Sequence, residues 1–530
     1  MTENLFYIGY VTHLITMHWA DVIAKEVADT CDHPLIATGI SPTGIIHVGS
    51  LREAITGESV RSAVEGLGKD VKLIYLVDSF DPLRKCYDFL PKEYEKYVGM
   101  PISRIPCPCG KHKNYAQHFV QPFLDAVDSL GVKCEIIWTH ELYDKGEFAE
   151  AIDLTFKKRQ QVIDILHDVS GKEANPNYAP YNPVCEKCGR FTNPVFESYK
   201  YPYVEYDCSC GHHGKADITK GDGKLTWRCE WPAKWAIFGT SAEPFGKDHA
   251  AAGGSYDTGK RISREIYGVE PPIPIPYEFV QLKGVGQMHK SLGCSVTGLD
   301  AINMTPPEVL NYLFLRVNPN KAIDYDSGLG MLDMADEYDR MERAFFSAEF
   351  TEAEENSVRA YEISQHNHVP VKQPHQIPYR HLVNVVQMAD TFEGVMGVLE
   401  RTEDFSTVSA DDLKRLERRV NCVRFWLNGF APDSVKFCVC QTAPPGLELG
   451  ITGKVFFKDL VNRMNDCVWD ASTINSIISD TGKESPLGSK GAFKAIYSVL
   501  IGKTAGPRLG PFLASMDKSF VINRFIQVSQ

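Results

Sequence analysis

Four cysteines near the middle of the chain have the spacing of metal ligands. They occur as two pairs, in NPVCEKCGRF and YDCSCGHH, with nineteen residues between the pairs. The four residues are Cys185, Cys188, Cys208 and Cys210. Two short loops that each offer two thiolates match the tetrahedral ligand set of a structural zinc ion. The pattern therefore predicts one structural zinc site, with four buried thiols as the alternative.

A second and less regular group of thiol and imidazole side chains lies in CPCGKH and just after it. Its members are Cys107, Cys109, His112 and His118. Because thiolate and imidazole are both common zinc ligands, these side chains are a weaker candidate for a second metal site.

The segment SPTGIIHVGS, residues 41–50, has the composition of a turn that binds an anion. It follows the apolar run PLIATGI, which predicts a buried strand, and precedes a segment with helical spacing. Backbone N–H groups at the start of a helix bind anions, and His47 adds a donor. Gly44 would let the backbone approach a ligand, and Gly49 would permit tight packing of helix on sheet. We predict nucleotide phosphate binding here, with an ordinary strand-to-helix turn as the alternative.

A second apolar run, KLIYLVDS at residues 72–79, predicts another buried strand. Two parallel strands joined by a helix imply a doubly wound sheet, in which ligands bind beyond the carboxyl ends of the strands. Both the glycine-containing turn and Asp78 would lie at that edge. Asp78 and Asp81 are therefore candidate counter-charges for a cationic ligand.

Further polar and aromatic residues could complete such a site. The segment GKDH places Asp248 beside His249, where they could meet a ribose hydroxyl and a charged amine. A capping aspartate with a surface histidine is the alternative. Trp227, Trp231 and Tyr277 could form walls around an aliphatic side chain. Core packing is the alternative for all three, and for Trp231 it is the favoured one.

Two segments resemble the signature motifs of class I aminoacyl-tRNA synthetases. The PTG turn followed by His47-Val48-Gly49-Ser50 resembles the HIGH motif, with serine in the fourth position. The segment GVGQMHKSLG, residues 284–293, resembles the KMSKS loop. The matching residues there are Met288, Lys290 and Ser291, and the departures are Gln287 and His289. Because of these departures, a non-catalytic tRNA-binding paralogue stays an alternative.

Longer stretches are similar to one branch of that class, the class I lysyl-tRNA synthetases. The similarity is closest within residues 227–263, in WRCEWPAKW and EPFGKDHAAAGGSYDTGKRIS. HWADVIAKEV, YRHL and KTAGPRLGPFL extend it over nearly the whole chain from His18. Cys229 and Glu230 stand where the family has an aliphatic residue and an aspartate, and Cys107-Pro108 replaces an aspartate-proline turn.

The resemblance implies an α/β Rossmann-like catalytic domain with a zinc-binding insertion, followed by an all-α C-terminal anticodon-binding domain. The expected divisions are an N-terminal extension at 1–17, the catalytic domain at 18–95 and 231–305, the insertion at 96–230, a connective helical region at 306–375 and the anticodon-binding domain at 376–530.

The same resemblance implies activation of lysine by ATP and transfer of the lysyl group to the 3′-terminal adenosine of tRNA(Lys). Mg²⁺ would accompany ATP, and Zn²⁺ would be structural. The catalytic residues would be His47, Lys290 and Ser291. The ATP-binding residues would be Thr43, Gly44, His47, Gly49, Ser50, Asp248, Met288 and Lys290. The substrate-binding residues would be Gly39, Ser41, Asp78, Asp81, Trp227, His249 and Tyr277. A glutamyl-type synthetase of the same class is the other alternative, and it would need cationic residues that face the substrate side chain.

The overall charge gives no sign of a nucleic-acid partner, because the 530-residue chain has a formal net charge of −12. A local basic face is nevertheless expected on the helix DDLKRLERRVNCVRFWL, away from its apolar side. Its cationic residues are Lys414, Arg415, Arg418 and Arg419. They would be either solvated charges or contacts to tRNA phosphates.

The fifteen cysteines indicate a reducing compartment, because they are an odd number spread widely along the chain. The sequence contains no run of eighteen apolar residues, so we predict no transmembrane helix and no membrane partner. We therefore expect a cytoplasmic protein.

Overall fold

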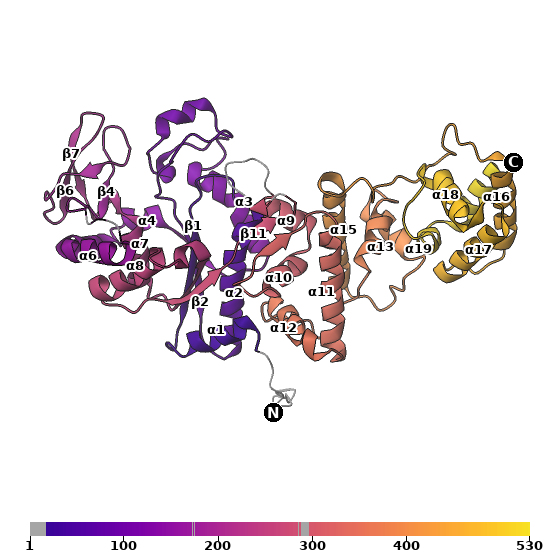
Figure 1. Cartoon of the computed structure of the whole chain (residues 1–530), viewed down its shortest axis with the longest axis horizontal. Helices are drawn as coiled ribbons and strands as arrows, with labels where there is room; N and C mark the ends of the chain where they lie inside the picture. Colours follow the sequence, from indigo (N-terminus) through magenta and orange to yellow (C-terminus); the bar gives the residue numbers. More distant parts are fainter. Residues whose placement is uncertain (1–16, 172, 174, 285, 288–295) are drawn as a thin grey trace. The chain divides into compact units, whose positions relative to one another are not determined.

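The computed structural model describes residues 17–171, 173, 175–284, 286–287 and 296–530. Contacts divide the chain into two compact units, coloured along the sequence in Figure 1. The first unit contains the described residues up to Ile302, with Pro307–Tyr325 and Met341–Val371. The second contains Asn303–Pro306, Asp326–Arg340 and Lys372–Gln530.

The first unit is built on a five-stranded sheet in the order β10-β9-β1-β2-β3, in which all neighbouring strands are parallel. The strands are β1 (Leu35–Ile40), β2 (Lys72–Val77), β3 (Glu135–Trp138), β9 (Ala242–Gly246) and β10 (Ile273–Tyr277). The register pairs Leu35 with Lys72 and Ile40 with Val77, so β1 and β2 end at the same edge. The two strands predicted from apolar runs are therefore confirmed.

Helix α2 (Leu51–Gly66) connects β1 to β2 and is buried on nearly all sides. It packs against the sheet and against α1 (Trp19–Ala28), α10 (Pro307–Leu315) and α12 (Glu355–Ser364). A helix enclosed in this way also encloses its polar side chains, which must then find partners inside the protein. Arg52 donates to the carbonyl of Glu278, and Glu58 pairs with Arg61 at 2.7 Å.

The stretch between β2 and β9 contributes both to the central sheet and to a separate lobe. The sheet strand β3, which follows α3 (Tyr115–Ser129), lies inside the segment 96–230. The lobe contains two small antiparallel sheets, β4 with β8 and β5 with β6 and β7. Their strands are β4 (Tyr181–Pro183), β5 (Asn193–Pro194), β6 (Tyr203–Asp207), β7 (His213–Asp217) and β8 (Gly223–Leu225).

The lobe shares one apolar core with the helices around it. These helices are α4 (Thr139–Asp144), α5 (Ala149–Lys157), α6 (Arg159–Ser170), α7 (Trp227–Phe238) and α8 (Ser255–Ile262). Phe80, which follows β2, packs in the same cluster as Tyr181 of β4 and Cys229 of α7. The lobe is therefore anchored directly behind the carboxyl ends of the central strands.

A third sheet completes the first unit. In it, β11 (Val280–Leu282) pairs with β12 (Gly286–Gln287) and β13 (Ile323–Tyr325). The turn at 41–50 is tied to the chain that follows this sheet, because the N–H of Val48 donates to the carbonyl of Val296 at 2.8 Å. Two further helices, α9 (Gly298–Met304) and α11 (Gly330–Ser347), follow in the sequence.

The regular elements among the described residues of the second unit are helices, and the first part of α11 belongs to it. Its helices are α13 (Tyr379–Val386), α14 (Phe392–Leu399), α15 (Ala410–Gly429), α16 (Gly450–Met464), α17 (Ala471–Glu484), α18 (Gly488–Ile501), α19 (Leu509–Ala514) and α20 (Lys518–Ser529). Helices α16–α20 enclose one apolar core. A helical C-terminal region is therefore confirmed. In the described part of the chain, no helix is long and apolar enough to cross a bilayer.

Helix α15 has the predicted apolar stripe, but one of its four cationic residues is not on the surface. Ser409 and Asp412 form a capping box at its start, and Val420 and Val423 are buried. Arg419 is also buried, and both ends of its guanidinium bind the carboxylate of Asp339. Its predicted place in a basic surface cluster is therefore wrong, because this arginine holds the helix to its own unit.

Candidate active site and metal centres

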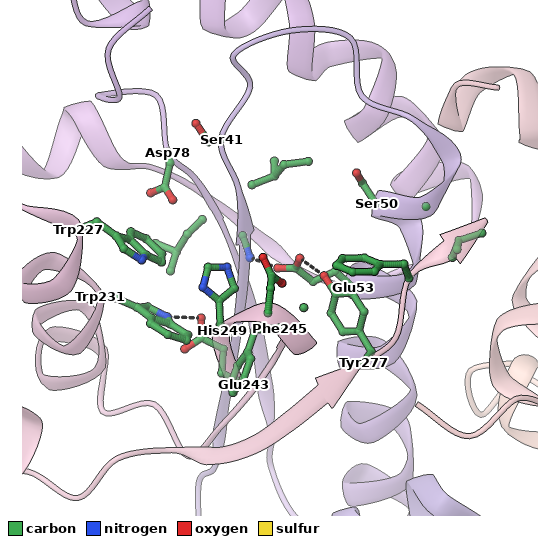
Figure 2. Close-up of a pocket in the computed structure, with 18 of the residues that line it drawn as sticks. Ser41, Ser50, Glu53, Asp78, Trp227, Trp231, Glu243, Phe245, His249 and Tyr277 are labelled. Carbon is green, nitrogen blue, oxygen red and sulfur yellow. Dashed lines mark hydrogen bonds between the residues drawn. The ribbon is translucent and has the colours of Figure 1, made fainter. Parts of the chain in front are cut away.

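A cavity of about 310 Å³ opens where the carboxyl ends of β1, β2, β9 and β10 meet, and Figure 2 shows the side chains that line it. This is the edge at which a doubly wound sheet binds ligands. Ten predicted site residues line it: Gly39, Ser41, His47, Gly49, Ser50, Asp78, Trp227, Asp248, His249 and Tyr277. Thr43, Gly44 and Asp81 are not among the lining residues.

One lining residue, Glu53 of α2, was not anticipated from the sequence. Its carboxylate accepts hydrogen bonds from Thr38 Oγ1 at 2.5 Å, from the N–H of Gly39 at 2.9 Å and from the hydroxyl of Tyr277 at 2.6 Å. Burial raises the pKa of Glu53, and the three hydrogen bonds lower it only in part. No cationic side chain pairs with this carboxylate among the contacts of the described residues. The cavity therefore contains an oriented carboxylate that suits a cationic ligand.

The two aspartates proposed as counter-charges already have cationic partners within the protein. Lys234 of α7 donates to Asp78, and Lys224 of β8 donates to Asp81 at 2.6 Å. Asp78 still reaches the cavity, but Asp81 does not. Its two oxygens accept from Lys224 and from Ser41, and a direct contact of Asp81 with a substrate stays a prediction.

Aromatic rings form one side of the cavity. Trp227 and Trp231 are stacked with ring centroids 5.3 Å apart, and His249 lies 5.4 Å from Trp231. Trp231 is buried in an apolar cluster and also lines the cavity. This residue therefore packs in the core and forms part of the cavity wall. The indole N–H groups of Trp231 and Trp235 donate to a second unanticipated carboxylate, Glu243. Burial raises the pKa of Glu243 to about 7.

Both glycines of the turn have close neighbours in the structure. A Cβ atom on Gly44 would lie 3.0 Å from the ring of Phe89, so this glycine leaves room for an aromatic side chain, and its approach to a ligand stays a prediction. A Cβ on Gly49 would lie 2.9 Å from Nδ1 of His47. The same Cβ would lie 3.4 Å from Cβ of Val280 in β11, so the lack of a side chain at Gly49 lets both the His47 imidazole and this strand lie close to the turn.

The backbone around His47 is partly occupied by internal hydrogen bonds. The N–H of Val48 donates to Val296, and the N–H of Ser50 donates to the carbonyl of His47 at 3.0 Å. These two N–H groups are therefore not open donors for an anion, which leaves a larger share of any phosphate contact to side chains such as His47 and Ser50.

The four cysteines predicted as a zinc site converge. The sulfurs of Cys185 and Cys210 are 3.7 Å apart, those of Cys188 and Cys208 are 3.5 Å apart, and all four lie within 4.8 Å of one another. A tetrahedral ion with Zn–S bonds of about 2.3 Å requires sulfurs roughly 3.8 Å apart. The donor set and its spacing therefore fit a tetrahedral metal ion.

The weaker candidate group converges as well. The sulfurs of Cys107 and Cys109 are 3.4 Å apart, and the Nδ1 atoms of His112 and His118 lie 3.2–3.6 Å from them. All four ligand atoms lie within 4.8 Å of one another. Two thiolates and two imidazoles at this spacing also match a tetrahedral zinc site.

Comparison with known proteins places the chain in a family. The model of the family described as tRNA synthetases class I (K) matches residues 17–367. The chain belongs to this family. A lysine--tRNA ligase from Thermoplasma acidophilum is 39% identical over 515 residues, which cover 97% of this chain and 99% of that protein. One from Archaeoglobus fulgidus is 40% identical over 511 residues, which cover 96% and 99%.

Solved structures of other class I synthetases are more distant. A glutamate tRNA ligase from Elizabethkingia meningosepticum is 12% identical, with a TM-score of 0.40 over 94% of this chain and 99% of that chain.

In this class I synthetase, the loop that resembles the KMSKS motif falls largely outside the described residues. Met288, Lys290 and Ser291 are among the residues that the structure does not describe. The strand that leads to them is described: β12 ends at Gln287, which pairs with Gln281 of β11. The predicted roles of Lys290 and Ser291 in catalysis stay predictions.

The synthetase site contains charged residues that the sequence did not reveal as functional. Glu53, Glu243 and Lys234 line the cavity from α2, β9 and α7. The one sequence signal for Glu53 was a charged residue in the first turn of a helix whose neighbouring positions, Ala54 and Ile55, are apolar. That signal alone does not separate a cavity residue from a surface residue.

Proposed function

We propose that this chain is a lysine--tRNA ligase that activates lysine with ATP and transfers it to the 3′-terminal adenosine of tRNA(Lys). The observation that carries the proposal is the buried carboxylate of Glu53, with three donors and no cationic partner among the described residues. An ammonium group of the substrate would supply the missing positive charge. The relatives from Thermoplasma acidophilum and Archaeoglobus fulgidus carry the same name.

The charges of the cavity favour lysine over glutamate. A site for a glutamate side chain needs a cation that faces the substrate. Lys234 is the only lysine among the described residues lining the cavity, and it is paired with Asp78. The aromatic wall of Trp227 suits the methylene groups of lysine. Both oxygens of Glu53 already accept hydrogen bonds from the protein, so the carboxylate suits a compact ammonium better than the forked guanidinium of arginine, which prefers to bind both oxygens at once.

The reaction would proceed in two displacements. A carboxylate oxygen of lysine attacks the α-phosphorus of ATP, and the bond to pyrophosphate breaks. A ribose hydroxyl of the terminal adenosine then attacks the carbonyl carbon of the adenylate, and AMP leaves. The protein would act by positioning the reactants and stabilising charge. ATP brings Mg²⁺ on its phosphates, which neutralises part of their charge.

Each described residue would have a defined part in these displacements. His47 and Ser50 would hold the phosphates, Asp248 would bind the ribose, and Glu53 with Tyr277 would hold the lysine ammonium. Lys290 and Ser291 would stabilise the leaving pyrophosphate, as their resemblance to the KMSKS motif implies. The second, helical unit would bind the anticodon. We place the enzyme, with its tRNA, in the cytoplasm.

The direct test is ATP–pyrophosphate exchange, measured with and without tRNA. We expect lysine to support exchange and glutamate and arginine not to support it at competitive rates, because neither places an ammonium at Glu53. Faster exchange with arginine or glutamate would contradict the amino-acid assignment. No exchange with any amino acid, in the presence of tRNA, would favour the non-catalytic paralogue.

We also propose that both cysteine-containing clusters hold structural zinc. For the second cluster, we expect Cys109→Ser to lower the zinc content from two ions per chain to one, because two imidazoles and one thiolate form an incomplete site. Elemental analysis of the purified protein measures this. Cys86→Ser is the matched control, since Cys86 lies nearby and outside both clusters. A wild-type content of one ion, unchanged in Cys109→Ser, would contradict the second site.

A further inference from the structure

A row of buried polar contacts links the lobe to the substrate cavity. Lys224, in β8, donates to Oδ1 of Asp81 at 2.6 Å. The other oxygen of that carboxylate, Oδ2, accepts from the hydroxyl of Ser41 at 2.6 Å. Ser41 lines the cavity, whereas Lys224 and Asp81 do not. The row therefore begins outside the cavity and ends on a side chain inside it.

A second carboxylate, that of Glu230, also contacts the ammonium of Lys224. That ammonium lies 2.9 Å from Oε2 of Glu230, whose Oε1 accepts from the hydroxyl of Tyr143 at 3.0 Å. That hydroxyl accepts in turn from the N–H of Leu225 at 3.1 Å. Burial lowers the pKa of Lys224, but Asp81 and Glu230 outweigh this effect and raise it, so the ammonium stays charged. One buried cation thus lies between two carboxylates.

The charge on Lys224 determines whether the Ser41 hydroxyl donates to Asp81 or accepts from it. Burial raises the pKa of Asp81, but Lys224 and the Ser41 hydroxyl outweigh it and lower the pKa, so the carboxylate is ionised. An ionised carboxylate can only accept hydrogen bonds, so the hydroxyl of Ser41 must donate to it. The Ser41 oxygen then offers lone pairs to other donors. Without the lysine, a buried carboxyl group would take up a proton and could donate to Ser41 instead.

We propose that Lys224 is a positioning residue for amino-acid binding, which acts through Asp81 to keep Ser41 oriented as an acceptor in the cavity. The α-ammonium of the amino acid is the donor that such an acceptor suits. This inference rests on the proposed function, and it gives the lobe a part in amino-acid binding without a contact to the substrate.

The strand that carries Lys224 is fixed beside the first cysteine cluster. Lys224 pairs with Asn182 of β4, and the N–H of Val184 donates to the carbonyl of Asp222 at 2.7 Å. Cys185 is the next residue after Val184. One cysteine of the cluster therefore follows the strand that pairs with the strand of Lys224, which explains how the lobe can support a residue at the edge of the active site.

The test compares Lys224→Met and Lys224→Arg with wild type in the full chain. We expect Lys224→Met to raise the Michaelis constant for lysine about tenfold or more, which corresponds to roughly 1.4 kcal/mol, with little change in that for ATP. Lys224→Arg should recover part of the loss, because it keeps the charge. In a Ser41→Ala background, Lys224→Met should have no further effect on lysine, because its influence passes through Ser41.

Lys220→Met is the matched control, since Lys220 lies on the same lobe and its exposed ammonium also pairs with an aspartate, Asp217. If Lys224→Met does not fold, Asp81→Asn tests the same step and should raise the lysine constant in the same way. A folded variant with unchanged lysine affinity, equal losses for lysine and ATP, or a full effect in the Ser41→Ala background would overturn the inference. Failure of the wild type to activate lysine would instead overturn the proposed function.

Discussion

Glu53→Gln is expected to lower kcat/KM for lysine by about 10²- to 10³-fold, because removing one partner of a buried charge pair typically costs a few kcal/mol. Glutamine keeps the size of the side chain and its ability to accept from Thr38 or Tyr277, but it leaves the substrate ammonium without a counter-charge. The Michaelis constant for ATP should stay within about twofold, because the amide leaves the phosphate side of the cavity unchanged.

Pyrophosphate exchange gives these constants, and calorimetry gives the affinity for lysine directly. Glu243→Gln is the matched control, since Glu243 is also a buried carboxylate that lines the cavity but already accepts from two indole N–H groups. We expect a much smaller effect on lysine there. Normal lysine affinity in Glu53→Gln, or equal losses in both variants, would show that Glu53 does not bind the ammonium.

The pH dependence of lysine binding offers a second measurement on the same residue. Burial raises the pKa of Glu53, so a proton competes with a bound cation at higher pH than it would at an ordinary glutamate. A cation binds the ionised form, and binding therefore releases that proton. Lysine affinity should rise with pH until Glu53 is fully ionised, and Glu53→Gln should remove this dependence.

The parts of the fold that could be predicted from the sequence are those that a local pattern determines. β1 and β2 were predictable because a strand buried on both faces is a short apolar run bounded by turn residues. The two cysteine-containing clusters were predictable because metal ligands in short loops are close in sequence. In both cases the residues that must come together are near one another in the chain or follow one simple periodicity.

The charges of the cavity could not be predicted because their partners are distant in sequence. Asp81 and Lys224 are 143 residues apart, and Asp78 and Lys234 are 156 residues apart. From the sequence the two aspartates were free carboxylates at the end of a strand. In the structure each aspartate pairs with a lysine, and the proposed function therefore assigns the cationic ligand to Glu53, which no local pattern distinguishes.

The four-cysteine cluster should be needed for the lobe to fold, and Cys185→Ser is the variant that tests this. Cys185 is buried in the same apolar core as Tyr181, Tyr206 and Cys229, so this proposed metal ligand is part of the packing of the lobe. Small metal sites contribute on the order of 10 kcal/mol to folding in isolated zinc-binding peptides. Losing such a site should lower the stability of the lobe by several kcal/mol.

Zinc analysis and thermal unfolding measure the two halves of this prediction. Cys185→Ser should lose one zinc ion per chain and unfold at a clearly lower temperature. A strong chelator, which would remove the zinc of both clusters, should lower the unfolding temperature of the wild type at least as much. Cys229→Ala is the matched control, because it removes a buried sulfur from the same core without removing a ligand, and a cavity of that size costs about 1–2 kcal/mol. Wild-type stability in a Cys185→Ser protein that has lost its zinc would mean that the apolar core, rather than the ion, holds the lobe together. We expect the unfolding temperature of Cys185→Ser to be well below that of Cys229→Ala. A thiol lost from the core leaves only a small void, whereas a lost metal ligand leaves three thiolates without the positive charge that brings them together.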